Sequence, residues 1–164
     1  MTAPRENEGP FFYARRMREA GGINDPFHLQ RFVEAQAKHY EAALSEISSG
    51  HKRSHWIWFV FPQVEGLGSS SMSRHYAIGS AAEAAAYLAH PVLGLRLRAC
   101  VTAMNALPEP DARAILGDID ALKFHSSMTL FAEIARGDSL FRQALEKFFG
   151  DRRDPKTVAF LETR

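Results

Sequence analysis

The chain has 164 residues, 46% of them hydrophobic and 24% charged, and these proportions exclude an intrinsically disordered chain. The formal net charge of +1 gives no long-range attraction to nucleic acid or to an anionic membrane, so neither is expected as a partner. One cysteine cannot form an internal disulfide, and the N-terminus lacks the apolar core of a signal peptide, so the sequence favours a cytoplasmic protein.

Residues 1–24 differ in composition from the rest of the chain. Glycine and proline interrupt a charged stretch there, and few large apolar residues are present. We expect an N-terminal arm over 1–24, attached through Phe11 and Phe12, followed by one helical domain over 25–164.

The first strong helix signal lies directly after the arm. Asp25 followed by Pro26 is typical of a helix start. Apolar residues recur at three- and four-residue steps from Phe32 to Ile47, which predicts an amphipathic helix of about five turns, ended at Gly50.

The aromatic segment from Trp56 to Phe61 has the composition of a β-strand. The sequence offers no second alternating segment to pair with it, and a buried lone strand would leave its backbone groups without partners. We therefore predict a short buried helix with Ser54 as its N-cap.

The remainder of the chain reads as a Gly/Ser loop over 64–73 followed by helices. Ser80, Asp118, Asp138 and Asp154 are predicted to cap helices, and Pro91 to open one. The predicted helices cover residues 74–78, 80–89, 91–107, 111–116, 118–136, 138–149 and 154–162. The pattern predicts an all-α fold, a single compact multi-helix domain.

The seven histidines do not form a metal-binding pattern. His28 and His39 share a helix face but lie about 16 Å apart along its axis. His51 and His55 are four residues apart without the glutamate of a zinc helix motif, so we expect no metal and no cofactor. Cys100 lies on an apolar stripe and is expected to be buried and unreactive.

Three segments carry candidate chemistry, and the first is the Gly/Ser loop. Gly66 and Gly68 form an incomplete dinucleotide fingerprint, with no strand before them and no P-loop lysine after them. A glycine loop that runs into a helix start, with Arg74 beyond it, can bind an anion. The alternative is a plain linker.

The second segment is Lys123–Thr129, which places three hydroxyl residues in four helical positions. Ser127 follows Lys123 by four residues, so their side chains are neighbours on a helix. The pair can be a ligand contact, an activated nucleophile, or small residues that allow close helix packing. Ser126 belongs to the same group.

The third segment is the aromatic one. Trp56 and Trp58 point to different sides of a helix, so one side can face a pocket where a base or a sugar stacks. Packing in the core is the alternative.

These segments resemble a known bacterial family. The matching blocks are His55-Trp56-Ile57-Trp58-Phe59-Val60-Phe61-Pro62-Gln63, Gly66-Leu67-Gly68-Ser69, Tyr76-Ala77-Ile78, His90-Pro91-Val92-Leu93-Gly94 and Lys123-x-x-Ser126-Ser127-Met128-Thr129. They are similar to the family catalogued as domain of unknown function 1810. The resemblance implies one all-α domain and brings no known activity. A calpastatin label carried by some members does not fit, because calpastatin is a disordered chain.

Two functions follow from these observations. In the first, the three segments converge on a cleft for a small anionic ligand resembling a nucleotide or a sugar phosphate, with or without hydrolytic turnover. In the second, the protein is a non-enzymatic protein–protein interaction module or a homo-oligomeric structural domain. The residues expected to bind the ligand are His55, Trp56, Trp58, Gln63, Gly66, Gly68, Ser69, Arg74, Lys123, Ser126 and Ser127.

Overall fold

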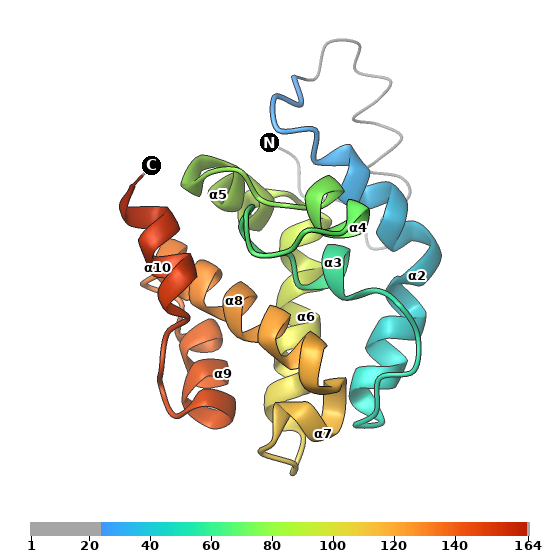
Figure 1. The fold of residues 1–164 in the computed structure, drawn as a ribbon. Helices are drawn as coiled ribbons and strands as arrows, with labels where there is room; N and C mark the ends of the chain where they lie inside the picture. The colour runs from blue at the N-terminus through green and yellow to red at the C-terminus, as the bar shows by residue number, and fades with distance from the viewer. Residues whose placement is uncertain (1–23, 164) are drawn as a thin grey trace.

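The computed structural model describes residues 24–163, which form nine α-helices and no β-strand (Figure 1). This confirms the predicted all-α fold, whereas nearly all of the arm expected over 1–24 lies outside the described residues. The helices are α2 (Gln30–Ser48), α3 (Ile57–Val60), α4 (Ser71–His75), α5 (Ala81–Ala89), α6 (Leu93–Ala106), α7 (Ala112–Leu116), α8 (Asp118–Ile134), α9 (Ser139–Phe149) and α10 (Pro155–Glu162).

Helices α6 and α8 occupy the centre of the domain. Helix α8 crosses in front of α6 in Figure 1 and contacts α3, α5, α7, α9 and α10. Helix α6 contacts α2, α3, α5 and α9. Because α8 has so many neighbours, most of its surface is buried, and one strip along its first half remains open.

Aromatic side chains fill the space between these helices. Phe61 and Phe124 are fully buried, with ring centroids 4.8 Å apart, and Tyr87 lies 5.6 Å from Phe131 in the same way. Edge-to-face and tilted ring pairs at these separations add to the free energy gained by burial alone. The core therefore joins the aromatic segment to α5 and α8.

The aromatic segment is helical and largely buried, as predicted. Its backbone groups find partners within the helix and from α2 and α5. The Gln36 side chain donates to the carbonyl oxygen of Phe59 at 2.6 Å, and the Tyr87 hydroxyl donates to the same oxygen at 3.3 Å. The predicted cap is wrong: Trp56 is the N-cap residue, and the Ser54 hydroxyl donates instead to Glu46 at 2.6 Å.

Two helices begin later than their sequence signals suggested. Helix α2 starts at Gln30 rather than near Asp25, because His28 takes a left-handed backbone conformation with φ of 52°. The Asp25 carboxylate still accepts hydrogen bonds from the N–H groups of Leu29 and Gln30, at 2.8 and 3.0 Å. It therefore caps the helix from a distance.

Helix α6 starts at Leu93, two residues after Pro91, because the His90 ring nitrogen Nδ1 accepts from the N–H groups of Val92 and Leu93.

The N-cap of α8 is Gly117, with φ of 90°, and Asp118 is the first helical residue. Helix α8 also ends at Ile134 rather than at residue 136. The predicted short helix over 74–78 lies earlier, as α4. The caps at Ser80, Asp138 and Asp154 are confirmed.

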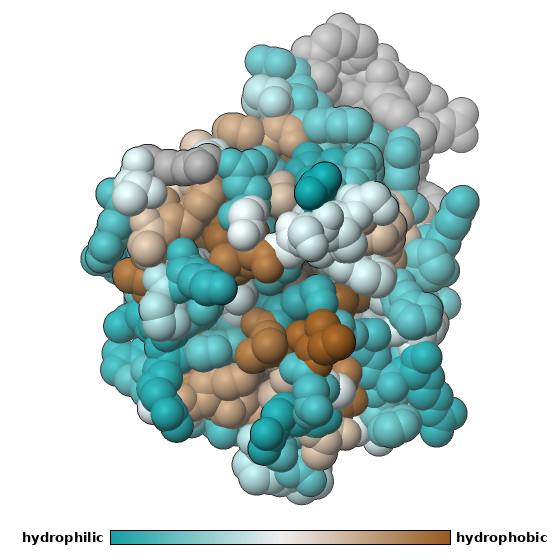
Figure 2. Space-filling model, in the orientation of Figure 1, coloured by the Kyte–Doolittle hydropathy of each residue, from teal (hydrophilic) through white to brown (hydrophobic). Residues whose placement is uncertain are grey.

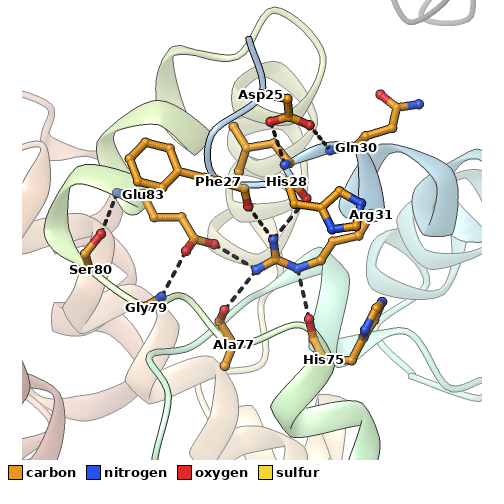
Figure 3. Close-up of polar contacts among 11 residues, drawn as sticks. Asp25, Phe27, His28, Gln30, Arg31, His75, Ala77, Gly79, Ser80 and Glu83 are labelled. Carbon is orange, nitrogen blue, oxygen red and sulfur yellow. Dashed lines mark hydrogen bonds and ion pairs between the residues drawn. The ribbon is translucent and has the colours of Figure 1, made fainter.

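Arg31 of α2 joins three separate segments (Figure 3). Its side chain is 11% exposed and forms a 2.8 Å ion pair with Glu83 of α5. The other N–H groups of its guanidinium donate to the carbonyl oxygens of Phe27, His28, His75 and Ala77. All five donors of the guanidinium are thus used.

The segment from Glu65 to Ala77 leaves the core and returns to it. At its base, the N–H of Ile78 donates to the carbonyl oxygen of Gln63 at 2.9 Å, and the N–H of Glu65 donates to that of Ile78 at 3.0 Å. These bonds form an isolated parallel bridge between Val64 and Ile78. The bridge and Arg31 close the segment, which we call the 65–77 excursion.

We predict that Arg31→Met destabilises the protein by about 3 to 5 kcal/mol, because it leaves the buried Glu83 carboxylate without its cation. Arg142→Met is the matched control. That arginine is 62% exposed, and the loss of its surface ion pairs is expected to cost about 1 kcal/mol or less. Urea unfolding monitored by circular dichroism measures the free energy of unfolding of both variants. Equal losses would contradict the role of Arg31 as the residue that joins α2, the excursion and α5.

Cys100 is fully buried, as predicted, and burial raises the pKa of its thiol to about 12. The reactive thiolate is therefore scarce at neutral pH. We predict that an aromatic disulfide reagent at pH 8 labels the native protein only as fast as the fold opens to expose Cys100. In denaturant the same reagent should label the thiol at once. Fast stoichiometric labelling without denaturant would show that the thiol is accessible.

Candidate functional site

A cavity of about 430 Å³ lies between the 65–77 excursion, α8 and the start of α10, and we call it the loop–α8 cavity. Five of the predicted ligand-binding residues line it: Gln63, Gly68, Ser69, Lys123 and Ser126. Segments about 60 residues apart in the sequence therefore meet at one concavity. The other lining residues are Leu67, Ser70, Ser73, Ile119, Leu122, His125, Asp154 and Lys156.

The excursion forms one wall, and its shape depends on a close approach at Gly68. A Cβ atom at this position would lie 2.5 Å from the Ser73 hydroxyl oxygen, so only glycine fits without a shift. Ser73 is itself buried, and its hydroxyl accepts a hydrogen bond from Ser70 at 2.9 Å. The Ser70 hydroxyl also caps α4 by accepting from the N–H of Ser73. The wall is thus fixed by contacts within the excursion.

Gln63 is the most deeply buried polar side chain in the cavity wall that has no protein partner. It is 9% exposed, and no hydrogen bond of its side-chain amide is found among residues 24–163. Its amide atoms are not among the fully buried unpaired side-chain atoms of the described residues, so the amide reaches the open space of the cavity. The amide of Gln63 is therefore free to bind whatever enters the cavity.

The α8 wall carries positive charge. Lys123 is 17% exposed and lies 3.6 Å from Asp120, which also pairs with Lys52 at 2.8 Å. Two lysines thus share one carboxylate, and the shorter contact belongs to Lys52. The ammonium of Lys123 keeps donors for a further partner in the cavity.

Ser126 is hydrogen-bonded on the same wall. Its hydroxyl lies 2.9 Å from the Asp154 carboxylate and 3.1 Å from the carbonyl oxygen of Leu122. Asp154 also accepts from the Thr157 hydroxyl at 2.5 Å as the N-cap of α10. The carboxylate thus serves mainly to cap a helix.

Ser127, in contrast, is fully buried and does not line the cavity. Its hydroxyl has no hydrogen-bond partner in the described part of the chain, so it forms no hydrogen bond with Lys123 there. The Lys123–Ser127 pair is therefore not assembled as a nucleophile and its activator. This side chain belongs to the packing between helices.

The remaining predicted residues lie elsewhere. His55 and Arg74 are exposed, and Trp58 is half-buried against the core. Gly66, with φ of 88°, turns the chain at the start of the excursion. None of these residues lines the loop–α8 cavity.

Trp56 is fully buried away from the cavity because Glu46 of α2 holds it. The indole N–H donates to the Glu46 carboxylate at 3.1 Å. The same carboxylate accepts from the N–H groups of Arg53 and Ser54, at 2.5 and 2.8 Å. Desolvation raises the pKa of Glu46, but these hydrogen bonds outweigh it and lower the pKa to about 2.

We predict that the stability difference between the wild type and Glu46→Gln depends on pH. Because the folded-state pKa lies below the ordinary value of 4.5, the ionised carboxylate stabilises the fold above that value and stops doing so as pH falls towards about 2. Urea unfolding at several pH values measures the difference. Glu41→Gln, at an exposed position of the same helix, controls for lost charge. A difference that persists at pH 2 would contradict the role of the ionised carboxylate.

Sequence reasoning missed several lining residues. The sequence pattern marks Asp154 and Lys156 only as parts of a helix start, although that start faces the cavity. His125 lies one residue before Ser126, and nothing in its local pattern marks it as a lining residue. Only the packing of α10 against α8 brings these residues together.

The described residues contain no cluster of three or more histidine, cysteine, aspartate or glutamate side chains that could hold a metal ion. Among the helices of residues 24–163, none combines the length and apolar character needed to cross a bilayer.

A family profile described as "Protein of unknown function (DUF1810)" matches residues 26–161. The chain belongs to this family. It is also similar to a solved structure, that of the conserved hypothetical protein Rv1873 from Mycobacterium tuberculosis, with 46% sequence identity and a TM-score of 0.82. The similarity covers 84% of this chain and 99% of that one. No match is found among curated proteins.

Proposed function

We propose that the protein binds a small molecule carrying an anionic group in the loop–α8 cavity. The observation that carries the proposal is the meeting of the glycine loop with Lys123 and Ser126 around one concavity that also holds the amide of Gln63. Pockets for small ligands have volumes of about 300 to 1,000 Å³ and a few convergent polar groups. The loop–α8 cavity is at the lower end of that range.

The charges of the lining favour an anion. Lys123 and Lys156 oppose the single carboxylate of Asp154. One oxygen of that carboxylate already accepts from Ser126 and Thr157, which spreads its negative charge into hydrogen bonds. The hydroxyl groups of Ser69 and Ser73, which line the cavity, add further donors. A phosphate, sulfate or carboxylate group would satisfy these donors together.

The proposal is for binding rather than turnover. Ser126 donates to an Asp154 oxygen that already accepts from the N–H and the hydroxyl of Thr157 as the cap of α10, so this carboxylate is committed to the cap rather than free to act as a base. Hydrolysis therefore has no specific support in the geometry of this cavity.

A second candidate function is a protein–protein contact. Ile119 and Leu122 on α8 are 70% and 68% exposed, and Figure 2 shows dark brown apolar atoms gathered in the middle of this face. Neighbouring exposed apolar side chains are typical of interaction sites. Sedimentation of the protein over a range of concentrations would detect self-association through this face.

We predict that phosphate raises the melting temperature of the wild type above that in chloride of equal ionic strength, and that Lys123→Met removes the difference. The variant itself should lose about 1 kcal/mol of stability or less, because Asp120 keeps its closer pairing with Lys52. Thermal denaturation monitored by circular dichroism measures both effects.

Lys38→Met is the matched control for this prediction. Lys38 is exposed on α2 and lines no part of the cavity, so its substitution should leave the phosphate effect intact. It also subtracts the general stabilisation that phosphate gives any folded protein. If Lys123→Met strongly destabilises the protein, and if phosphate does not raise the melting temperature of the wild type, Lys123 is only a structural ion-pair partner.

A further inference from the structure

A second cavity, of about 490 Å³, lies on the other side of the open strip of α8, between α7 and the end of α9. We call it the α7–α9 cavity. Its lining differs in chemistry from that of the loop–α8 cavity, because apolar side chains are prominent in it. These are Pro110, Ala112, Ala121, Leu122, Phe148 and Phe149.

The two cavities adjoin. Leu122 and His125 line both of them. Residues three apart are neighbours on a helix surface, so these two side chains form one ridge along α8. A molecule seated in the loop–α8 cavity needs only to cross this ridge to reach the α7–α9 cavity.

Two contacts fix the orientation of the His125 side chain on this ridge. The imidazole lies parallel to the Phe149 ring, with centroids 4.1 Å apart and an angle of 16° between the planes. Its Nε2 atom is 2.7 Å from the carbonyl oxygen of Arg152. Two contacts of different kinds thus hold the ring in one orientation, which gives the α7–α9 cavity a flat aromatic wall.

The charges of the α7–α9 cavity balance. Arg113 pairs with Asp111 at 3.4 Å, and Asp118 and Arg152 also line the cavity with opposite charges. A second anionic group would gain little there, whereas an apolar or aromatic group would bury surface against the phenylalanines. The two cavities therefore suit the two ends of an amphipathic molecule.

We propose that the two cavities form one site for a molecule in which an aromatic ring is joined to a phosphate-like group, as in a nucleoside monophosphate. The phosphate occupies the loop–α8 cavity, and the ring crosses the Leu122–His125 ridge into the α7–α9 cavity. This inference rests on the proposed function and narrows it: a sugar phosphate has no apolar end to place in the α7–α9 cavity.

Isothermal titration of the full chain with three probes tests the inference. The probes are inorganic phosphate, phenyl phosphate and adenosine 5′-monophosphate. We expect both aromatic probes to bind at least about tenfold more tightly than inorganic phosphate, because only they reach the α7–α9 cavity. Ribose 5-phosphate, which carries no aromatic ring, should bind like inorganic phosphate.

A variant of the ridge separates the two ends of the site. Leu122→Gln removes an apolar side chain that is 68% exposed, so the fold should tolerate it. Because it removes apolar surface and no charge, it should weaken the binding of both aromatic probes about tenfold more than it weakens the binding of inorganic phosphate. Leu95→Gln is the matched control: that leucine is 70% exposed on α6 and lines neither cavity.

The outcomes distinguish this inference from the proposed function. If the wild type binds inorganic phosphate and the aromatic probes equally, the α7–α9 cavity takes no ring, and anion binding alone stands. If Leu122→Gln and Leu95→Gln weaken the aromatic probes equally, the ridge has no part in binding. If no probe binds, both the inference and the proposed function are wrong.

Discussion

A guanidinium group that is nearly buried must have all of its donors satisfied, and the position of the 65–77 excursion depends on how Arg31 meets this requirement. Its five N–H groups donate to carbonyl oxygens of the turn before α2 and of the end of the excursion, and to one carboxylate oxygen of α5. An arginine suits this role because its planar fork reaches several acceptors at once, which a lysine ammonium cannot do. The three segments are therefore joined at one point.

The position of the candidate site depends on these contacts of Arg31 and on three further sets of contacts. The aromatic core fixes α8, whose open strip supplies Lys123, Ser126 and the Leu122–His125 ridge. The bridge at Val64 and Ile78 fixes where the excursion leaves the core. The contact of Gly68 with Ser73 then shapes the wall that faces α8. Each of these contacts restricts the next, so contacts within the protein define the shape of the cavity.

Much of the fold could be predicted from the sequence because helix caps and apolar stripes are local signals. The helical state of the Trp56–Phe61 segment followed from the lack of a pairing strand, and the bonds to Phe59 show how a buried helix of four residues is satisfied. Helix starts were misplaced where the capping group acts from a distance, as Asp25 and His90 do.

The site could be predicted only in part. The sequence singles out Lys123 and Ser126 because their segment places three hydroxyl residues in four helical positions, whereas Gln63 is marked only as the end of the aromatic block that resembles the family. The sequence could not show that Glu46, ten residues before Trp56, takes the indole N–H and holds the ring in the core. Nor could it show that α10 folds back onto α8, because that contact depends on packing rather than on any local pattern.

The closed base of the 65–77 excursion has a consequence for how such a domain can diversify. The bridge between Val64 and Ile78 and the clamp from Arg31 both act at the ends of the segment, and the Tyr76 ring packs on Phe32 at 5.7 Å just inside it. The stretch between these anchors is held to the scaffold mainly at its two ends. We therefore expect its length and composition to tolerate change in a chimera while the helical scaffold keeps its stability.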